Sequence, residues 1–206
     1  MTYSPYKDGY GSKWPSSCIV SDLYNNISRL PRRQRAMDFG CGLGPHGLLL
    51  ETCGFREVFY VDKDFAALES AREFLRNFPY SGSRFFLSDI FEISETSKFD
   101  VIIDRASLQH VSKDLLPKIL SRIASILFAT EYGGKSHGCL ISEWVVSSSM
   151  SQVENFPEIT YYNEIRTILD DKFKTISKVY RTSEWILDTD VSSHKVVNLV
   201  LTPLKQ

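Results

Sequence analysis

Residues Asp38–Gly44 read Asp-Phe-Gly-Cys-Gly-Leu-Gly, and this stretch decides the fold. Glycines at alternate positions let a backbone turn sharply beside a ligand, because no side chains fill the space. An apolar strand is predicted before the stretch, over 35–39, and a helix after it, over 45–53. The first N–H groups of such a helix have no partner within it and can bind a ligand. The sequence therefore predicts a strand–turn–helix unit with a ligand site, in which Asp38 meets a cationic group of the ligand.

Short strands and helices alternate in the chain after this unit. Strands are predicted at 57–61, 84–87, 99–103 and 139–146, and helices at 65–78 and 112–129. This alternation is typical of a parallel sheet with helices on both faces. After a helix near 161–169, strands at 173–180 and 195–202 have no helix between them and should pair antiparallel. We predict an α/β fold, a Rossmann-like doubly wound sheet that is mostly parallel with an antiparallel last strand.

Acidic residues fall where two further strands end, the edge at which such sheets bind ligands. Asp62 follows Gly42 by twenty residues, and its carboxylate can accept from both hydroxyls of a ribose. The alternative for Asp62 is to cap the helix that begins just beyond it. Asp89 can accept from an adenine amino group while the Ile90 N–H donates to a ring nitrogen. The alternative for Asp89 is a solvated loop residue.

The glycine turn, the second-strand acid and the third-strand acid, in this order, resemble the class I S-adenosylmethionine-dependent methyltransferases. The likeness covers residues 38–90 and, with the later strands, extends to about residue 146. It implies a seven-stranded sheet and S-adenosyl-L-methionine as the cofactor. Lys13 is expected to meet the donor's carboxylate, and Asp104 and Arg105 are expected either to pair with each other or to help hold the donor. The predicted cofactor-binding residues are Lys13, Trp14, Asp38, Gly40, Cys41, Gly42, Gly44, Asp62, Lys63, Asp89, Ile90, Asp104 and Arg105.

The segment Asp104–His110 reads Asp-Arg-Ala-Ser-Leu-Gln-His and follows the fourth predicted strand. His110 is the candidate catalytic residue, because an imidazole can take a proton from an acceptor hydroxyl near neutral pH. The alternative is a histidine that packs at the start of the next helix. Ser107 and Gln109 are expected to orient the donor. The segment lacks the Asn/Asp-Pro-Pro-aromatic signature of enzymes that methylate nucleobase amino groups.

Together with Lys13-Trp14-Pro15, this segment resembles small bacterial methyltransferases associated with sugar or surface-polysaccharide modification. The resemblance implies a small-molecule or sugar acceptor and O-methylation. The acceptor pocket would be formed by the N-terminal segment, the loop after Asp104 and residues 147–163. Tyr6, Tyr10 and Trp14 would form a flap over the site or, alternatively, an aromatic anchor on the flank of the sheet.

Length and composition limit the remaining possibilities. The 206 residues are 43% hydrophobic, which suits one domain, with a flap and helix at 1–34, a cofactor core at 35–146 and a C-terminal part at 147–206. A net charge of −1 does not favour nucleic acid or a membrane as partner. The four cysteines have no disulfide or zinc spacing, so we expect a cytoplasmic protein. Asp104, His110 and Glu143 have no metal-ligand spacing, so we expect no metal, and the oligomeric state stays open.

Two other functions fit part of the sequence. A nicotinamide-dependent oxidoreductase would use the pattern Gly42–Gly47 and Asp62, but it leaves Asp89 unexplained and needs a catalytic Tyr-x-x-x-Lys, which is not apparent after the first predicted strand. A cofactor-binding but catalytically silent partner subunit stays possible because no general base is secure.

Overall fold

The computed structural model describes residues 13–30, 32–78, 83–87, 89–94, 96–128, 138–148, 162–187 and 190–204. The predicted flap residues Tyr6 and Tyr10 lie outside the described residues. So do residues 149–161, which are most of the third segment predicted to form the acceptor pocket.

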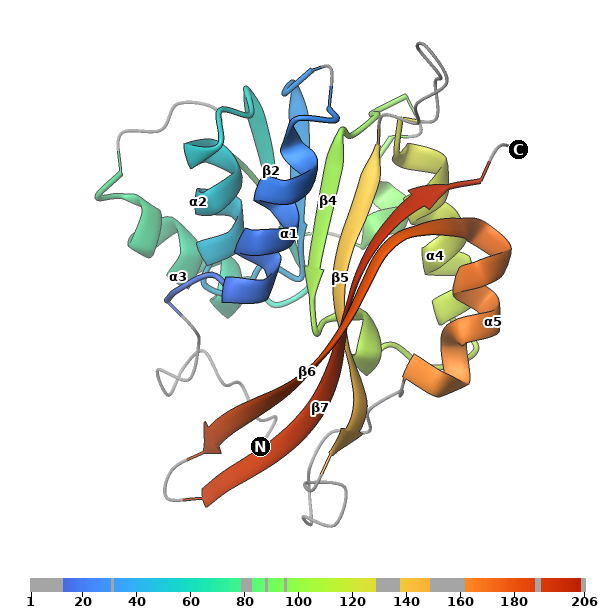
Figure 1. The fold of residues 1–206 in the computed structure, drawn as a ribbon. Helices are drawn as coiled ribbons and strands as arrows, with labels where there is room; N and C mark the ends of the chain where they lie inside the picture. The colour runs from blue at the N-terminus through green and yellow to red at the C-terminus, as the bar shows by residue number, and fades with distance from the viewer. Residues whose placement is uncertain are drawn as a thin grey trace.

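Seven strands form one sheet in the order β3-β2-β1-β4-β5-β7-β6 (Figure 1). The first five strands run parallel, and β7 lies antiparallel between β5 and β6. This confirms the predicted Rossmann-like sheet with an antiparallel last strand. The strands are β1 (Arg35–Phe39), β2 (Glu57–Asp62), β3 (Ser83–Leu87), β4 (Val101–Arg105), β5 (Cys139–Ser148), β6 (Phe173–Leu187) and β7 (Asp190–Pro203).

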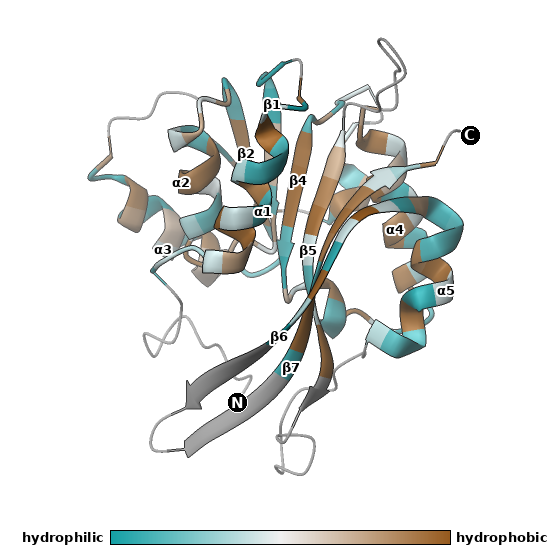
Figure 2. Cartoon of the chain, viewed as in Figure 1, coloured by the Kyte–Doolittle hydropathy of each residue, from teal (hydrophilic) through white to brown (hydrophobic). Residues whose placement is uncertain are grey.

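Helices cover both faces of the sheet. One face carries α1 (Ser17–Ile27), α2 (Pro45–Thr52) and α3 (Phe65–Leu75), and the other carries α4 (Leu116–Ile126) and α5 (Tyr162–Lys172) (Figure 1). We call the first the α1 face and the second the α4 face. Figure 2 shows apolar colour concentrated on the central strands and on the sides of the helices that meet them. This pattern is what burial of one apolar stripe per helix produces.

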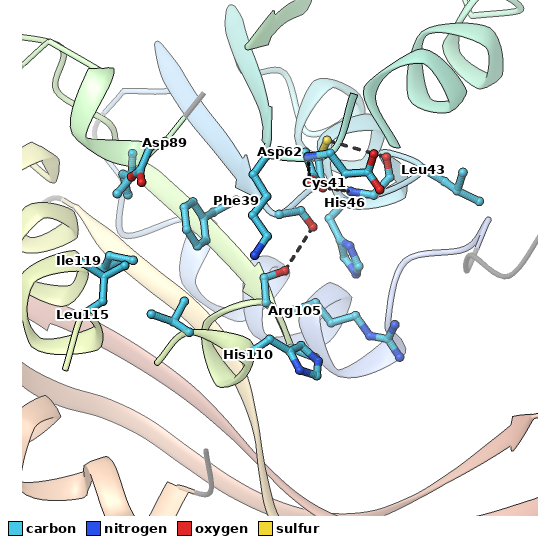
Figure 3. Close-up of a pocket in the computed structure, with 18 of the residues that line it drawn as sticks. Phe39, Cys41, Leu43, His46, Asp62, Asp89, Arg105, His110, Leu115 and Ile119 are labelled. Carbon is cyan, nitrogen blue, oxygen red and sulfur yellow. Dashed lines mark hydrogen bonds between the residues drawn. The ribbon is translucent and has the colours of Figure 1, made fainter. Parts of the chain in front are cut away.

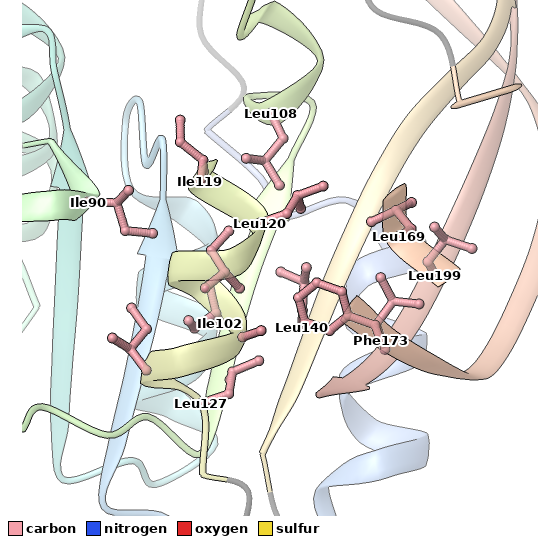
Figure 4. Packing of buried hydrophobic residues seen from close by; sticks show 14 of the residues in the cluster. Ile90, Ile102, Leu108, Ile119, Leu120, Leu127, Leu140, Leu169, Phe173 and Leu199 are labelled. Carbon is pink, nitrogen blue, oxygen red and sulfur yellow. The ribbon is translucent and has the colours of Figure 1, made fainter. Parts of the chain in front are cut away.

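Two hydrophobic clusters fill the space between the helices and the sheet. The cluster on the α4 face joins residues such as Ile102, Leu120 and Leu140, as Figure 4 shows. The cluster on the α1 face includes Leu23, Leu50 and other apolar side chains. Because successive strand residues point to opposite faces, each central strand contributes to both clusters.

The segment after β1 shows a close approach between α2 and β2. A Cβ atom built on Gly47 would lie 2.0 Å from Cε1 of Tyr60, whose side chain is fully buried. Only glycine therefore fits at residue 47 in this packing. The Gly47 N–H also donates to Asp38 Oδ2 at 2.8 Å, which fixes the first turn of α2 to the end of β1.

The region after β4 differs from the sequence prediction. The strand spans Val101–Arg105 instead of 99–103, because residue 99 makes only an isolated bridge to Leu127. The helix predicted from residue 112 begins at Leu116, with Pro117 in its first turn, where proline costs no hydrogen bond. Between them Leu108–His110 forms a short 3-10 helix, η2, and a second such helix, η1 (Ile90–Glu92), follows β3.

Candidate functional site

A cavity of about 550 Å³ opens at the carboxyl ends of β1, β2 and β4. This volume lies within the range of pockets that hold small-molecule ligands. Figure 3 shows Asp89, Leu115 and Ile119 at one end, His46, Arg105 and His110 at the other, and Phe39 between them. Nine of the predicted site residues line the cavity: Gly40, Cys41, Gly42, Asp62, Lys63, Asp89, Ile90, Arg105 and His110.

Asp62 connects the end of β2 to the glycine turn. Its Oδ2 accepts from the Gly42 N–H at 3.0 Å, and its Oδ1 accepts from the Asp64 N–H at 2.9 Å. The alternative that Asp62 caps α3 is wrong, because Asp64 is the N-cap and accepts from the Ala66 N–H at 2.8 Å. Each carboxylate oxygen of Asp62 has a second lone pair, so the group can still accept from a ligand in the cavity.

The far end of the cavity combines a carboxylate with apolar side chains. Asp89 caps η1 by accepting from the Phe91 N–H at 3.2 Å, and Ile90 beside it is buried. Leu115 and Ile119 lie one helical turn apart and reach the cavity from the opposite side, a pair that the sequence analysis did not identify. Apolar walls beside a hydrogen-bonding edge suit a flat aromatic ring.

The loops after β1 and β4 touch each other. A Cβ atom on Gly40, whose φ is +65°, would lie 2.0 Å from Ser107 Oγ. The Ser107 hydroxyl instead donates to the Gly40 carbonyl at 3.2 Å. Ser107 therefore lines the cavity and holds the turn in place, whereas Gln109 faces β5 and accepts from the Val145 N–H at 3.3 Å.

Asp104 also holds the loop after β4 in place, through hydrogen bonds from the loop's backbone. It is fully buried and accepts from the N–H groups of Ser107 and Leu108, each at 3.0 Å, and from the Ser142 hydroxyl at 2.6 Å. Burial raises its pKa to about 6, although the three hydrogen bonds act in the opposite direction. The carboxylate does not line the cavity, because strand alternation turns residue 104 toward the α4 face.

Four other predicted cofactor residues also lie outside the cavity lining. Asp38 is buried behind the turn, where its carboxylate is occupied by the Gly47 N–H, and burial raises its pKa well above the usual range. Gly44 is the N-cap of α2 and packs near Tyr60. Lys13 and Trp14 both lie at the exposed start of the described chain, and Trp14 is 81% exposed. The structure thus does not bring these residues to the cavity.

His46, which the sequence analysis did not select, lines the cavity from the first turn of α2. Its Nε2 accepts from the Ser16 N–H at 3.0 Å, a bond to the residue that precedes α1. Burial and, to a lesser extent, the Arg105 charge together lower the pKa of His46 to about 3, so the imidazole is neutral near pH 7. No pattern in the sequence marks this contact, because it depends on where α1 packs.

His110 and Arg105 complete this end of the cavity. His110 is exposed, and its Nε2 lies 3.4 Å from the Gln109 side-chain nitrogen. Arg105 pairs with Glu143 on β5, with its Nε 3.5 Å from Oε1, and not with Asp104. The side chains of Asp104 and Arg105 cannot pair readily because neighbouring strand residues face opposite sides of the sheet.

Within the described residues, no three histidine, cysteine or acidic side chains are grouped to hold a metal ion. No helix in that part of the chain has the length and apolar character needed to cross a membrane.

The fold and the cavity are those of an α/β protein with a small-molecule site at the carboxyl ends of its strands, and comparison with known proteins indicates the class. Residues 36–129 match the model of a family described as a methyltransferase domain. This match spans less than half of the chain, and it supports the predicted enzyme class, an S-adenosylmethionine-dependent methyltransferase, and its cofactor. Among curated proteins none matches the chain.

Solved structures agree with this fold. The magnesium protoporphyrin IX methyltransferase of Synechocystis PCC 6803, solved with SAH, is 19% identical with a TM-score of 0.62, and the match covers 88% of this chain and 80% of that one. A SAM-dependent methyltransferase of Anabaena variabilis is 16% identical with a TM-score of 0.65, covering 90% and 84%. The PH0226 protein of Pyrococcus horikoshii OT3 is 18% identical with a TM-score of 0.66, covering 98% and 100%. At these identities the likeness concerns the fold alone.

Proposed function

We propose that the cavity binds S-adenosylmethionine across its whole length and that the chain methylates a hydroxyl of a small molecule or sugar. The observation that carries this proposal is the convergence of three loops on one cavity. The turn after β1, Asp62 at the end of β2 and Asp89 with Ile90 after β3 all line it. A nucleoside with an amino-acid tail needs these three kinds of contact in this order.

The residues present fit the cofactor. Asp62 would accept from the two ribose hydroxyls, since both of its oxygens retain a lone pair. The apolar side chains of Leu115 and Ile119 would hold the adenine ring, with Asp89 accepting from the amino group. The amino-acid tail would lie along the glycine turn near Arg105 and Lys63, which supply positive charge for a carboxylate.

Bound S-adenosylmethionine supplies a methyl group on a sulfonium centre. The contribution of the chain is mainly to hold donor and acceptor in line, which can account for much of a rate enhancement. His110 lines the cavity at the end opposite Asp89 and is the candidate general base for the acceptor hydroxyl. The neutral His46 faces the same end, but its ring nitrogen is engaged by Ser16.

Calorimetry with S-adenosylhomocysteine and with NAD, on the same preparation, tests the proposal. We expect saturable binding of S-adenosylhomocysteine and none of NAD. The reverse result would favour the oxidoreductase alternative. Binding of the nucleoside without transfer of a labelled methyl group to any acceptor would favour the silent partner subunit.

A further inference from the structure

Arginines gather at the edge of the sheet where β1, β2 and β3 begin, opposite the edge that carries the cavity. Three of them belong to the segment that joins α1 to β1, which Figure 1 shows at this edge. Another precedes β2, and the last two lie at the start of β1 and β3. The net charge of −1 for the whole chain conceals this local concentration of positive charge. We call the group the arginine edge, and its members are Arg29, Arg32, Arg33, Arg35, Arg56 and Arg84.

Backbone and side-chain contacts hold these arginines in a row. The Arg56 N–H donates to the Arg33 carbonyl at 3.0 Å, so the loops before β1 and β2 lie side by side. Arg35 on β1 and Arg84 on β3 both pair with the Glu57 carboxylate at the start of β2, each at 2.7 Å. Because β1, β2 and β3 are neighbours in the sheet, the row crosses three strands that are spaced about 4.8 Å apart.

Most members of the arginine edge lack a counter-charge. Four are exposed and form no ion pair with any residue that the structure describes: Arg29, Arg32, Arg33 and Arg56. Exposed arginines on the helices are arranged differently, since Arg72 pairs with Glu69 at 2.5 Å and Arg166 pairs with Asp170 at 3.6 Å. Like charges without nearby counter-charges create a positive potential that attracts anions. The edge is therefore suited to an anionic partner.

Two of the unpaired guanidinium groups are held in fixed orientations. The guanidinium carbon of Arg32 lies 4.6 Å from the centroid of the Phe128 ring, a cation–π contact. Arg33 Nη1 donates to the Cys53 carbonyl at 3.0 Å, which leaves the other N–H groups of this guanidinium for a ligand. A planar guanidinium can bind a phosphate through two parallel hydrogen bonds. Groups that are already oriented lose less conformational freedom on binding.

The shape of the site favours a chain of phosphates over a single phosphate ion. None of the six arginines lines the cavity at the other edge, and they follow an open row instead of surrounding one point. Separated guanidinium groups in a row match the successive phosphates of one nucleic-acid strand. The Phe128 ring and the guanidinium planes can also stack on bases, and such stacking is tolerant of sequence.

We propose that the arginine edge binds a single-stranded nucleic acid, through its phosphates and without sequence preference. Guanidinium–phosphate pairs supply the affinity, and bases stack beside them on the planar groups. The bound strand is held at the edge opposite the cavity, so these contacts do not place it as the methyl acceptor. This inference goes beyond the proposed function and does not depend on it.

The test measures fluorescence anisotropy of a labelled oligouridylate of about 12 nucleotides with the full chain in about 50 mM salt. The edge variant carries Arg29→Gln, Arg32→Gln and Arg56→Gln. It leaves the hydrogen bond of Arg33 and both ion pairs of Glu57 in place. Melting temperatures check that the variant folds, and Arg29→Gln alone is the second variant, since it changes one exposed side chain.

The matched control variant removes the same amount of charge from another part of the surface. It carries Lys113→Gln, Lys118→Gln and Arg166→Gln, three exposed cations in and beside α4 and α5. These residues lie on the α4 face, away from the starts of β1, β2 and β3. A comparison of the two triple variants therefore separates binding at the arginine edge from a general effect of net charge.

We expect saturable binding by the wild type, with a slope of about −3 for log K against log salt concentration, because four unpaired arginines displace counterions from a single strand. The edge variant should raise Kd about tenfold or more and make the slope shallower by about 2, and Arg29→Gln alone should make it shallower by about 0.7. The control variant should bind within about twofold of the wild type. The affinity for S-adenosylhomocysteine should be equal in all of these proteins.

Four results would overturn the proposal. These are no saturable binding by the wild type, an unchanged Kd in the folded edge variant, an equal loss in the control variant, and displacement of the oligonucleotide by an equal concentration of inorganic phosphate. Vesicles that contain phosphatidylserine are measured in parallel. Binding to these vesicles without binding to the oligonucleotide would assign the edge to a membrane surface and overturn the proposal as well. Failure of S-adenosylhomocysteine to bind would count against the proposed function alone.

Discussion

The backbone N–H of Gly42 donates to Oδ2 of Asp62 at 3.0 Å. The glycine turn after β1 and the acid at the end of β2 are therefore one hydrogen-bonded unit and not two independent ligand contacts. A substitution in either residue will disturb the position of the other. This coupling affects how binding measurements on the site are interpreted.

Asp62→Ala should weaken the binding of S-adenosylhomocysteine by about 10- to 100-fold, because charge-assisted hydrogen bonds to the ribose are lost. Calorimetry measures this change in affinity. The affinity of Asp62→Asn should lie between those of the wild type and Asp62→Ala. Asp64→Ala is the comparison variant. It removes the cap of α3 and should cost about 0.5–2 kcal/mol in the free energy of unfolding with a smaller effect on affinity. Wild-type affinity in a folded Asp62→Ala protein would exclude the ribose role.

Gly47→Ala should destabilise the protein by about 1–3 kcal/mol, because its new methyl group would overlap the Tyr60 ring. Thermal unfolding should show a melting temperature lowered by several degrees, at about 2–4 °C per kcal/mol for a chain of this size. The double variant Gly47→Ala with Tyr60→Leu should recover part of that loss relative to the sum of the single changes. Strict additivity of the two changes in the free energy of unfolding would show that residues 47 and 60 are not in contact.

His110→Ala should lower the single-turnover rate by about 10²- to 10⁴-fold if the imidazole is the general base. Binding of S-adenosylhomocysteine should be retained, since the residue would face the acceptor. A variant with a lower melting temperature but full turnover would show instead that His110 only packs in the loop and that positioning is the main catalytic device.

His46 should make stability depend on pH in a defined direction. Its folded pKa is about 3 and the ordinary value is 6.5, so between these values the unfolded chain binds the proton first. The contribution of the neutral His46 to the free energy of unfolding is complete above pH 6.5 and is lost as the pH falls toward 3. Urea unfolding should show that the wild type loses up to about 2 kcal/mol more than His46→Gln between pH 6.5 and 5.

Asp104 has the opposite pH dependence. Its pKa is raised to about 6, so its contribution is present at low pH and lost as the pH rises through that value. Asp104 is present in both the wild type and His46→Gln. Its contribution to the free energy of unfolding therefore cancels when the two proteins are compared. Equal pH dependence of the wild type and His46→Gln would contradict the buried, neutral state of His46.

The sequence was sufficient to predict the elements with strong local signals. The strand 35–39 is observed with the predicted bounds, because an apolar segment is closed by the glycine turn. The antiparallel pairing of the last two strands followed from the missing helix between them. Asp62 and Asp89 were predicted at the cavity because each lies at or just beyond the end of a strand, where side chains reach the ligand edge of the sheet.

The parts that could not be predicted depend on tertiary packing. Whether Asp104 or Arg105 reaches the cavity depends on where β4 ends. A shift of one residue along the strand turns a side chain to the opposite face of the sheet. The end of β4 has no clear mark in this sequence, unlike the end of β1. His46 is bound by Ser16 from a segment 30 residues earlier in the chain, a contact that depends on how α1 lies on the sheet. Lys13 and Trp14 were included on a short resemblance, without a pattern that fixes their position.

Gly47 also has a bearing on how such chains are classified. It is the last glycine of the pattern Gly42–Gly47 that also occurs in nicotinamide-dependent enzymes, and here its neighbour is the ring of Tyr60. In those enzymes the third glycine likewise permits close packing of helix and strand. A search that scores this glycine therefore measures the spacing between a helix and a sheet, which both enzyme classes share. The residues that separate the classes lie after the third strand and in the last hairpin, so an automated assignment based on the glycines alone would group enzymes of unlike chemistry.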